Sequence, residues 1–331
     1  MSGVRVVKIK TFARLHIALI AMSKKGYRVN GGFGFSIDYP ALNIEIKNSD
    51  EFIFKDNREM STSQQEIDRH KNKIEFIKKK YGIERNLAIS VSGSLQSHSG
   101  FGSGTAIRLA IIEGLFLLND ISVNNDQLTS YSGRGGTSGI GVRTYFEGGY
   151  VFDVGKKNKK EHLLPSSSLE NNPKQSLIIA QGKMPNWNFG ICIPNKVKGL
   201  SNIQEVNFFK TNALLSNEEV HKVVYEVVFG LVASIKELDK ETFSSAIKKI
   251  QTSGWKKAER SIYKGEIELY EQILYNAGAK CVGMSSLGPC LFFTSDDVVD
   301  LIEKLRSKMP NCELFASSSK NSGRTIIIDN A

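Results

Sequence analysis

Hydrophobic and polar residues alternate along the first fifty positions of the chain, and this alternation predicts β-strands. The segments "VRVVKIKTFARLHIALIAM" (4–22) and "GFGFSIDYPALNIEIKNS" (32–49) are both rich in β-branched residues. Residues 56–82 instead carry apolar side chains at helical spacing in a polar background, which predicts an exposed helix. "NLAISVSGSL" (86–95) is typical of a short strand, and it ends at a glycine-rich loop.

The rest of the chain continues to mix predicted helices and strands. Residues 105–120 are almost continuously apolar, as in a helix that is buried on most sides. Strands are predicted at "GYVFDVG", at "SLIIAQG" and "FGICIPN", which look like a pair, on both sides of the loop in "KCVGMSSLGPCLFFTS", and at "GRTIIIDN". Helices are predicted at 216–238, 240–252 and 295–309, the last capped by Ser295 or Asp296. Without a regular βαβ rhythm, the pattern favours an α+β fold over a doubly wound sheet.

A polar stretch at 156–175, rich in Lys, Ser, Asn and Pro, predicts a loop or a domain boundary. A chain of 331 residues is long enough for two domains. We therefore expect an N-terminal domain over 1–170 and a C-terminal α+β domain over 171–331.

The formal net charge of +10 raises the question of nucleic-acid binding. The Lys-rich stretches are short and scattered, as at 78–80 and 156–160, and no aromatic residues are interleaved with them as a stacking surface would need. We therefore expect no nucleic-acid partner. A basic surface also attracts small polyanions, so the charge identifies no ligand by itself.

The apolar runs and the cysteines bear on location. The longest apolar run is interrupted by Glu113 and Gly114, so no membrane span is expected. The N-terminus has no signal-peptide pattern, which favours a cytoplasmic protein. The four cysteines lack metal-ligand spacing and are expected to be reduced thiols: Cys192, Cys281, Cys290 and Cys312.

The loop in "SHSGFGSGTAIRLA" (97–110) carries the first candidate chemistry. Its glycines let the backbone approach a ligand closely, its hydroxyls can donate hydrogen bonds, and the following helix offers free N–H groups and a positive dipole end. These features predict a phosphate site at Gly100, Gly102, Ser103, Gly104 and Thr105. The lysine of a Walker-type loop is missing, and a plain tight turn is the alternative interpretation.

Two further glycine clusters extend this picture. "GRGGTSGIGVRTYFEGG" (133–149) carries two arginines, and "GMSSLGP" (283–289) lies between two predicted strands. Together the three loops resemble the three signature motifs of the GHMP superfamily of small-molecule kinases. The central motif of that superfamily is Pro-x-x-x-Gly-Leu-Gly-Ser-Ser. This chain matches it at 100–104 but has Gln96 in place of the proline and Gly104 in place of the second serine.

The run from Thr137 to Gly141 argues against kinase chemistry. Mevalonate-kinase-like members have Pro-Ser-Gly-x-Asp here, followed seven residues later by the Gly-Gly that is Gly148-Gly149 in this chain. Gly141 therefore stands where those kinases carry the catalytic aspartate. A glycine can neither polarise nor deprotonate a substrate hydroxyl, so simple phosphoryl transfer from ATP is disfavoured.

One branch of the superfamily, the β-ribofuranosylaminobenzene 5′-phosphate (β-RFAP) synthases, combines these features. The chain resembles that family over most of its length, in "ARLHIALI", "RVNGGFGFSID", "SHSGFGSGT", "GRGGTSGIG", "FEGGYVFDVG", "MPNWNFGICIP", "GLSN", Glu205 and "SSLGP". The resemblance implies an N-terminal domain like domain 2 of ribosomal protein S5 and a ferredoxin-like C-terminal domain.

The family's reaction is a phosphoribosyl transfer in methanopterin biosynthesis. The resemblance implies that phosphoribosyl pyrophosphate condenses with 4-aminobenzoate or 4-hydroxybenzoate, with loss of carbon dioxide and pyrophosphate. It also implies Mg²⁺ as cofactor and an archaeal, cytoplasmic homodimer. The sequence leaves the choice between the two acceptors open, because a single contact can distinguish one para substituent.

The resemblance and the motifs together predict roles for individual residues. Anion ligands are expected from the glycine loops and from arginines, whose guanidinium groups match phosphate and carboxylate. The candidate catalytic residues are His98, Arg134 and His16. The candidate substrate- and phosphate-binding residues are Gly100, Gly102, Ser103, Gly104, Thr105, Arg14, Arg28, Asn30, Gly135, Gly136, Ser138, Arg143, Ser285 and Ser286. Asp153, or alternatively Asp38, is the candidate Mg²⁺ ligand, and Trp187, Phe33 and Phe101 are candidates for an apolar wall around the aromatic ring.

Two other hypotheses about the function stay open. The chain could be a GHMP kinase for a small alcohol that takes its base from an unfamiliar position. It could also be a non-catalytic paralogue that binds a sugar phosphate, since Ala21, Gln96 and Ala106 stand where the family is expected to have Asp, Pro and Gln.

Overall fold

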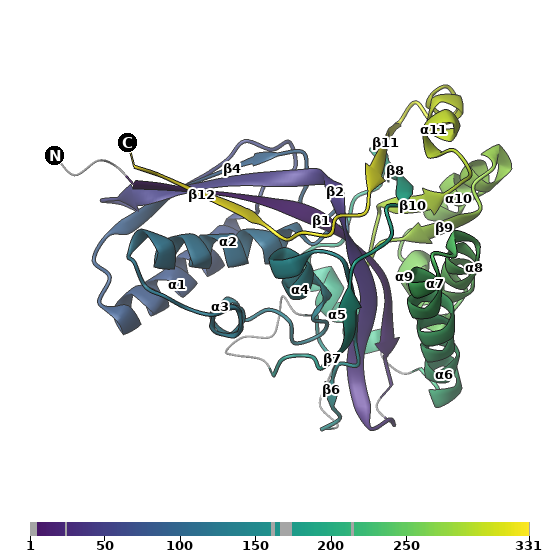
Figure 1. Ribbon diagram of the computed structural model, residues 1–331, viewed down its shortest axis with the longest axis horizontal. Coiled ribbons are helices and arrows are strands. Elements are labelled where there is room, and N and C mark those ends of the chain that lie inside the picture. Colours follow the sequence, from purple (N-terminus) through teal and green to yellow (C-terminus); the bar gives the residue numbers. More distant parts are fainter. Residues whose placement is uncertain (1–4, 24, 160–162, 166–173, 213–214, 331) are drawn as a thin grey trace.

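The computed structural model describes residues 5–23, 25–159, 163–165, 174–212 and 215–330. Two β-sheets lie next to each other (Figure 1). The first and larger sheet carries the early helices, and the smaller sheet carries most of the later ones.

The large sheet grows out of one long antiparallel hairpin of β1 (Arg5–Ala21) and β2 (Arg28–Ser49). Val7 and Ile9 are buried, while Lys8 between them is exposed. This is the period of two that the sequence shows, and it places the apolar face of the hairpin against the helices.

Six further strands complete the large sheet in the described part of the chain. They are β3 (Ile53–Asp56), β4 (Asn86–Gly93), β5 (Tyr150–Asp153), β6 (Lys156–Lys157), β7 (Ile178–Gly182) and β12 (Thr325–Asn330). The main order is β12-β1-β2-β4-β3, with β5 and β6 also paired to β2 and β7 paired to β5. The last strand runs beside the first, with Arg5 opposite Asn330.

The expected boundary between residues 170 and 171 lies outside the described residues. The two sheets do not separate there, because β7 and β12 both come later in the chain and both belong to the large sheet. The boundary was inferred from the polar composition of a loop. Which sheet a strand joins is decided instead by its pairing with strands that are distant in the sequence.

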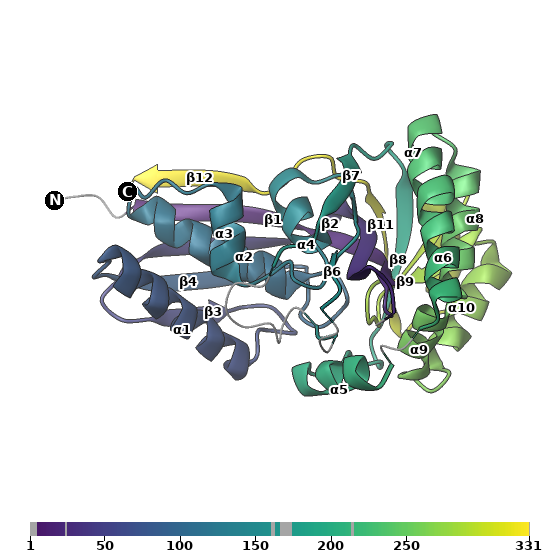
Figure 2. The same cartoon turned by 90° about the horizontal axis from the view of Figure 1, so that it is seen from below.

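Four helices cover one face of the large sheet (Figures 1 and 2): α1 (Gln64–Tyr81), α2 (Ser103–Leu118), α3 (Asn125–Ser132) and α4 (Ile140–Glu147). The central helix is α2, which is buried on most sides as its sequence predicts. A Cβ atom at Gly114 would lie 2.3 Å from Cδ1 of Ile46. This glycine therefore lets α2 lie directly against β2.

The small sheet contains β8 (Asn188–Pro194), β9 (Cys281–Met284), β10 (Leu291–Thr294) and β11 (Cys312–Ser318). Its antiparallel order is β11-β8-β10-β9, so its strands taken in sequence are arranged 4-1-3-2. With helices between the first and second strands and between the third and fourth, this is the ferredoxin-like arrangement expected for the C-terminal half.

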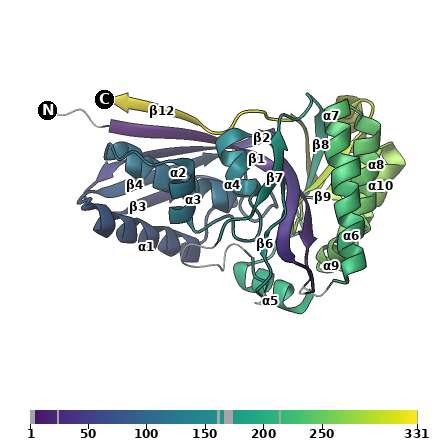
Figure 3. The same ribbon diagram turned by 60° about the horizontal axis from the view of Figure 1, so that its bottom comes forward.

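The helices of this half are α5 (Asn202–Asn212), α6 (Asn217–Tyr225), the π-helical η2 (Glu226–Val232), α7 (Ala233–Glu237), α8 (Lys240–Gln251), α9 (Gly254–Ser261), α10 (Glu266–Ala277) and α11 (Val298–Arg306). Helices α6, α7, α8 and α10 lie on the side of the small sheet away from the large one (Figure 3). Phe35 of β2 packs on Phe189 of β8, with ring centroids 4.8 Å apart, so the two sheets share one core.

Two local predictions were wrong. The segments "SLIIAQG" and "FGICIPN" do not pair with each other, because β7 pairs with β5 whereas β8 lies between β10 and β11. The helix at 298–306 is capped by Asp297, whose side chain accepts the amides of Val299 and Asp300, rather than by Ser295 or Asp296. Among the described helices, none combines the length and hydrophobicity needed to cross a bilayer.

Candidate active site

The glycine-rich loop turns sharply to deliver the chain into the first turn of α2. Gly100 and Gly102 have φ angles of 89° and 86°, which residues with a side chain rarely adopt. A Cβ at Gly100 would lie 2.4 Å from the carbonyl oxygen of Ser285, and one at Gly102 would lie 3.1 Å from Nε of Arg14. No side chain of the described residues caps α2, so the N–H groups of its first turn and the positive end of its dipole are not neutralised by a capping side chain.

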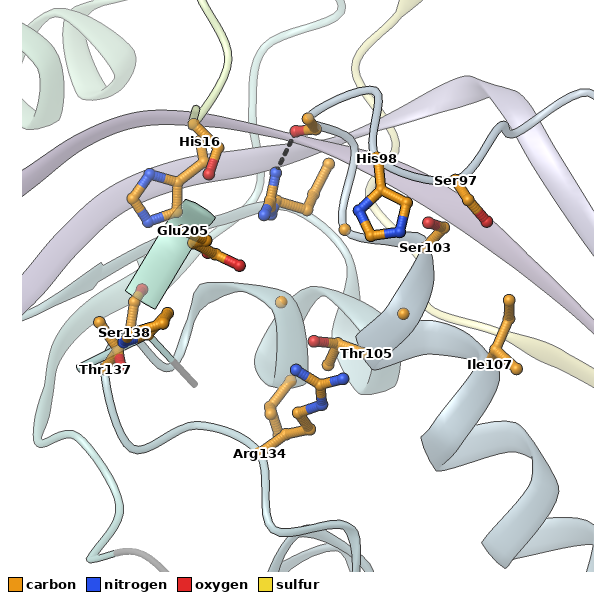
Figure 4. Close-up of a pocket in the computed structure, with 18 of the residues that line it drawn as sticks. His16, Ser97, His98, Ser103, Thr105, Ile107, Arg134, Thr137, Ser138 and Glu205 are labelled. Atoms are coloured by element: carbon orange, nitrogen blue, oxygen red, sulfur yellow. Dashed lines mark hydrogen bonds between the residues drawn. The ribbon is translucent and has the colours of Figure 1, made fainter. Parts of the chain in front are cut away.

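A pocket opens at this helix end (Figure 4). Three of the sequence motifs converge on it, together with α1, α4 and α5. Among the described residues it is lined by Arg14, His16, Leu19, Thr62, Glu66, His70, Ser97, His98, Gly100, Gly102, Ser103, Gly104, Thr105, Ile107, Arg134, Gly135, Thr137, Ser138, Gly141, Val142, Pro165, Glu205, Phe209 and Ser286.

Arg134 is the main cationic feature of the pocket. The residue is only 7% exposed, and its Nε atom has no hydrogen-bond partner among the described residues. Figure 4 shows its guanidinium directed toward Thr105 at the start of α2. Burial lowers the pKa of Arg134, against the opposing effects of Glu66 and Glu205. A buried guanidinium beside a free helix N-terminus is a strong site for an anion.

Arg14 adds a second buried positive charge. Its Nη1 donates to the carbonyl of Gly100 at 2.5 Å, while its Nε has no partner in the described structure. Burial lowers the pKa of Arg14 to about 10, so its guanidinium is still charged at neutral pH. Arg14 thereby fixes the glycine loop and adds to the field at the same end of the pocket.

Glu66 and His98 form an ion pair on the other side of α2's first turn. Their Oε2 and Nε2 atoms are 3.6 Å apart. Contact with Glu66 raises the pKa of His98, although burial opposes this. Burial disfavours a charged Glu66, but His98 and then Arg134 outweigh this effect and lower its pKa to about 2. The pair therefore favours a protonated His98 at the pocket.

The pocket-facing carboxylate of Glu66 is held in place by its own helix. Ser63 caps α1 by accepting the amide of Glu66, and its hydroxyl donates to Oε2 of Glu66 at 3.3 Å. A Cβ at Gly104 would lie 3.6 Å from Oε1 of Glu66 and 3.5 Å from Nη2 of Arg134. The carboxylate and the guanidinium thus flank the same point of α2.

His16 and His70 are neutral members of the site. Burial lowers the pKa of His16 well below its usual value, and Arg14 and Lys256 reinforce the shift. Burial, with the charges of Arg108 and Arg134, lowers the pKa of His70 to about 3. Both can accept or donate a hydrogen bond near neutral pH but neither carries a charge.

The third glycine loop fastens the first loop to β1. Ser285 receives the amide of His16 at 3.0 Å and donates to the carbonyl of Gly100 at 2.9 Å. Below this loop lies the buried Lys256, which pairs with Glu259 and donates to the carbonyls of Met284 and Ser286. Ser286 lines the pocket, whereas Ser285 lies outside the lining and links the third glycine loop to β1 and to the first glycine loop by hydrogen bonds.

Several predicted ligands lie outside the pocket lining. Arg28 donates to the carbonyls of Val154 and Gly155 at 2.7 and 2.6 Å, so its guanidinium holds a turn instead of a substrate. Arg143 faces outward, 3.7 Å from Asp126 and 3.8 Å from Glu147.

Asn30 and Gly136 also stand behind the site. Nδ2 of Asn30 donates to the carbonyl of Gly136 at 3.5 Å, and the amide of Gly31 donates to Thr137. They support the loop whose other residues, Gly135 and Ser138, do line the pocket. A sequence motif contains both residues that line the pocket and residues that hold its loops in place. The fold is needed to distinguish the two kinds.

Asp153 does not fit a metal site. It is fully buried, and its oxygens accept the amides of Gly139 and Gly155 and the hydroxyl of Ser138. Burial raises its pKa to about 6 despite these bonds. The carboxylate stabilises the turn that precedes α4 and lies outside the pocket lining.

The alternative metal ligand fares no better. Oδ1 of Asp38 is engaged by the hydroxyl of Ser317 and the amide of Ser318. In the described part of the chain, no three His, Cys, Asp or Glu residues gather as a metal centre would require. The residues present therefore do not fit a resident Mg²⁺ held by the protein alone.

The proposed aromatic wall is not at the pocket. Phe33 stacks on Tyr150 in the core, Phe101 is buried below the loop, and Trp187 packs on Phe243. These rings are core residues. The apolar lining comes instead from Leu19, Ile107, Val142, Pro165 and Phe209.

Sequence reasoning missed the contributions of α1 and α5. Glu66 is the fourth residue of "SQQE", a capping-box pattern that predicts a helix start but not what its carboxylate faces. Glu205 was noted only as part of the resemblance, and its side chain lies at the pocket (Figure 4). Phe209, one turn further along α5, also lines the pocket.

Residues 69–146 match the family model for the GHMP kinases N terminal domain. A β-ribofuranosylphenol 5′-phosphate synthase from Archaeoglobus fulgidus is 31% identical over 326 residues, covering 96% of this chain and 98% of the relative. The enzyme of the same name from Methanothermobacter thermautotrophicus is 30% identical, covering 87% and 88% of the two chains.

Solved structures agree on the fold. Mevalonate pyrophosphate decarboxylase from Streptococcus pyogenes has a TM-score of 0.67 at 12% identity, covering 97% of this chain and 98% of that one. Homoserine kinase from Cytophaga hutchinsonii has a TM-score of 0.63 at 15% identity, covering 97% of each chain. These neighbours show the two-domain α+β GHMP fold. The sequence relatives go further, and the chain belongs to the β-ribofuranosylphenol 5′-phosphate synthase family of the GHMP superfamily.

Proposed function

We propose that the protein is a phosphoribosyltransferase that condenses phosphoribosyl pyrophosphate with 4-hydroxybenzoate, releasing carbon dioxide and pyrophosphate, in methanopterin biosynthesis. The observation that carries the proposal is the buried guanidinium of Arg134, whose Nε has no hydrogen-bond partner among the described residues, beside the uncapped start of α2. This is an anion site in a pocket where Gly141 provides no acid or base. The name of the family, ribofuranosylphenol phosphate synthase, favours the hydroxybenzoate over the aminobenzoate.

The reaction suits a pocket without a catalytic carboxylate at position 141. The ring carbon that bears the carboxylate forms the bond to C1 of the ribose, and the C1–O bond breaks with its electron pair leaving on pyrophosphate. The bond to the carboxyl carbon then breaks, its electrons restore the aromatic ring, and carbon dioxide leaves. No proton is gained or lost overall, so the main catalytic demand is stabilisation of the departing pyrophosphate.

The residues of the pocket divide between these tasks. The loop at 100–105, Arg134 and protonated His98 bind the pyrophosphate, where negative charge develops. Arg14 supports the loop and strengthens the positive field. The apolar lining, including Val142 and Phe209, excludes water from the sugar cation as it forms.

Mg²⁺ enters this proposal only as an ion that arrives with the donor's pyrophosphate, because the described residues form no metal centre of their own. We also propose a cytoplasmic homodimer, as expected for the family.

The deciding experiment follows the acceptor's carboxyl group. The purified protein is incubated with phosphoribosyl pyrophosphate, Mg²⁺ and carboxyl-labelled 4-hydroxybenzoate, with 4-aminobenzoate in a parallel reaction. We expect labelled carbon dioxide and pyrophosphate in equal amounts, and more from the hydroxybenzoate. Controls omit the donor or replace it with ATP. Phosphorylation of an alcohol by ATP would support the kinase alternative, and donor binding without turnover would support a sugar-phosphate-binding paralogue.

A further inference from the structure

Gly141 is a glycine that the fold itself does not require. It lies in the first turn of α4, and its φ angle is not in the left-handed region. The three atoms nearest to a Cβ built there all belong to Thr105, at 3.6, 3.7 and 3.8 Å, which are ordinary van der Waals distances. The described part of the protein therefore has room for a methyl group at this position.

Two other glycines of the same domain, in contrast, are required by close packing. A Cβ at Gly114 would overlap Ile46 at 2.3 Å, and one at Gly34 would lie 2.4 Å from the carbonyl of Leu15. Glycine is also among the poorest helix formers, so a glycine within α4 lowers stability relative to alanine. At position 141 this loss of helix stability is not offset by any close approach of the described residues.

The position of Gly141 in the pocket suggests what needs the space. Next to Gly141 stands Thr105, the last residue of the glycine loop that binds anions. The same pocket is lined by apolar side chains, namely Val142, which follows Gly141 in α4, and Leu19 and Phe209 from β1 and α5. Gly141 therefore contacts the anion-binding loop through Thr105 and is followed in its own helix by a residue of the apolar lining.

We propose that the missing side chain at position 141 leaves room for the aromatic ring of the acceptor where it meets C1 of the ribose. This inference rests on the proposed function, and it makes Gly141 a specificity-determining residue. With pyrophosphate held at the start of α2, the C1–O bond that breaks lies next to Thr105, and the ring must approach C1 from the apolar side. A methyl group at position 141 would occupy that line of approach, and its contacts with Thr105, at 3.6 to 3.8 Å, are ordinary van der Waals contacts that leave the anion-binding loop in place.

The test compares Gly141→Ala and Gly141→Val with the wild type. The matched control is Gly26→Ala, another glycine with an ordinary φ angle, whose Cβ would come no closer than 3.4 Å to the carbonyl of Arg28 and which does not line the pocket. Four quantities are measured: the melting temperature, the Kd of inorganic pyrophosphate, the Kd of 4-hydroxybenzoate with pyrophosphate present, and carbon dioxide release.

For Gly141→Ala we expect a melting temperature equal to or above that of the wild type and an unchanged Kd for pyrophosphate. The Kd of 4-hydroxybenzoate should rise by about tenfold or more, and Gly141→Val should raise it further. Wild-type affinity for the acceptor in both variants would overturn the inference. So would a lower melting temperature for Gly141→Ala, because the room would then be needed by the fold. If the wild type binds the acceptor but releases no carbon dioxide, the proposed function fails while the binding comparison still decides this inference.

Discussion

Replacement of Arg134 should separate the protein's stability from its affinity for the donor. In Arg134→Met the side chain keeps a similar length but loses its charge. A hydrogen bond to a charged group contributes about 1.5–3 kcal/mol net. Loss of one such contact to pyrophosphate therefore predicts a Kd that is about 10- to 150-fold higher.

The same substitution should not destabilise the fold. Arg134 is 7% exposed, its Nε has no hydrogen-bond partner in the described structure, and burial lowers its pKa. A buried charge without a full set of partners costs free energy, so an apolar side chain of similar size should leave the unfolding free energy equal or higher.

The assay is calorimetric titration with inorganic pyrophosphate and with phosphoribosyl pyrophosphate at one fixed salt concentration, together with thermal unfolding. Arg306→Met serves as the control, since Arg306 lies on α11 and contacts only Glu303 among the ion pairs of the described residues. It removes the same charge from the net balance. Equal losses of affinity in both variants, or an Arg134→Met protein with unchanged affinity, would refute the assignment of Arg134 to the donor's pyrophosphate.

Three further predictions concern other residues of the structure. Contact with Glu66 raises the pKa of His98, and the protonated form is lost as pH rises through that pKa. Glu66→Gln should therefore make pyrophosphate binding decline at a lower pH than in the wild type; titrations between about pH 5.5 and 8.5 check this, and superimposable profiles would contradict it. Lys256→Met leaves Glu259 buried without its cation and should cost about 3–5 kcal/mol in urea unfolding, whereas an unchanged midpoint would show that the pair is dispensable. Gly141→Asp should abolish carbon dioxide release and gain no ATP-dependent phosphorylation of small alcohols, measured as ADP formation; a gain would revive the kinase alternative.

The elements that the sequence predicted best are those with strong local periodicity. The alternation in β1 and β2 and the apolar run of α2 depend on burial within one element, and each appears in the structure where it was expected. The errors came from choices between distant partners. Nothing local in β7 specifies that it pairs with β5 instead of β8.

In the site too, local features were predicted from the sequence and contacts between distant segments were not. The glycine loop was identified because positive φ angles at Gly100 and Gly102 have a sequence signature. Arg134 and Arg28 have similar motif contexts, yet one guanidinium reaches the pocket and the other holds the carbonyls of a turn. The direction of an arginine side chain depends on the tertiary structure around it, and so does the contact between Glu66 and His98.

The pairing of β12 with β1 has a consequence for synthesis of the protein. The strand that covers the outer edge of β1 comes from residues 325–330, the last segment that the structure describes. A nascent chain therefore exposes the edge of β1 until residues 325–330 have been synthesised, and such edges invite pairing with other chains. Removing these six residues would leave that edge permanently open, so we expect the truncated protein to aggregate even though every residue of the pocket is retained.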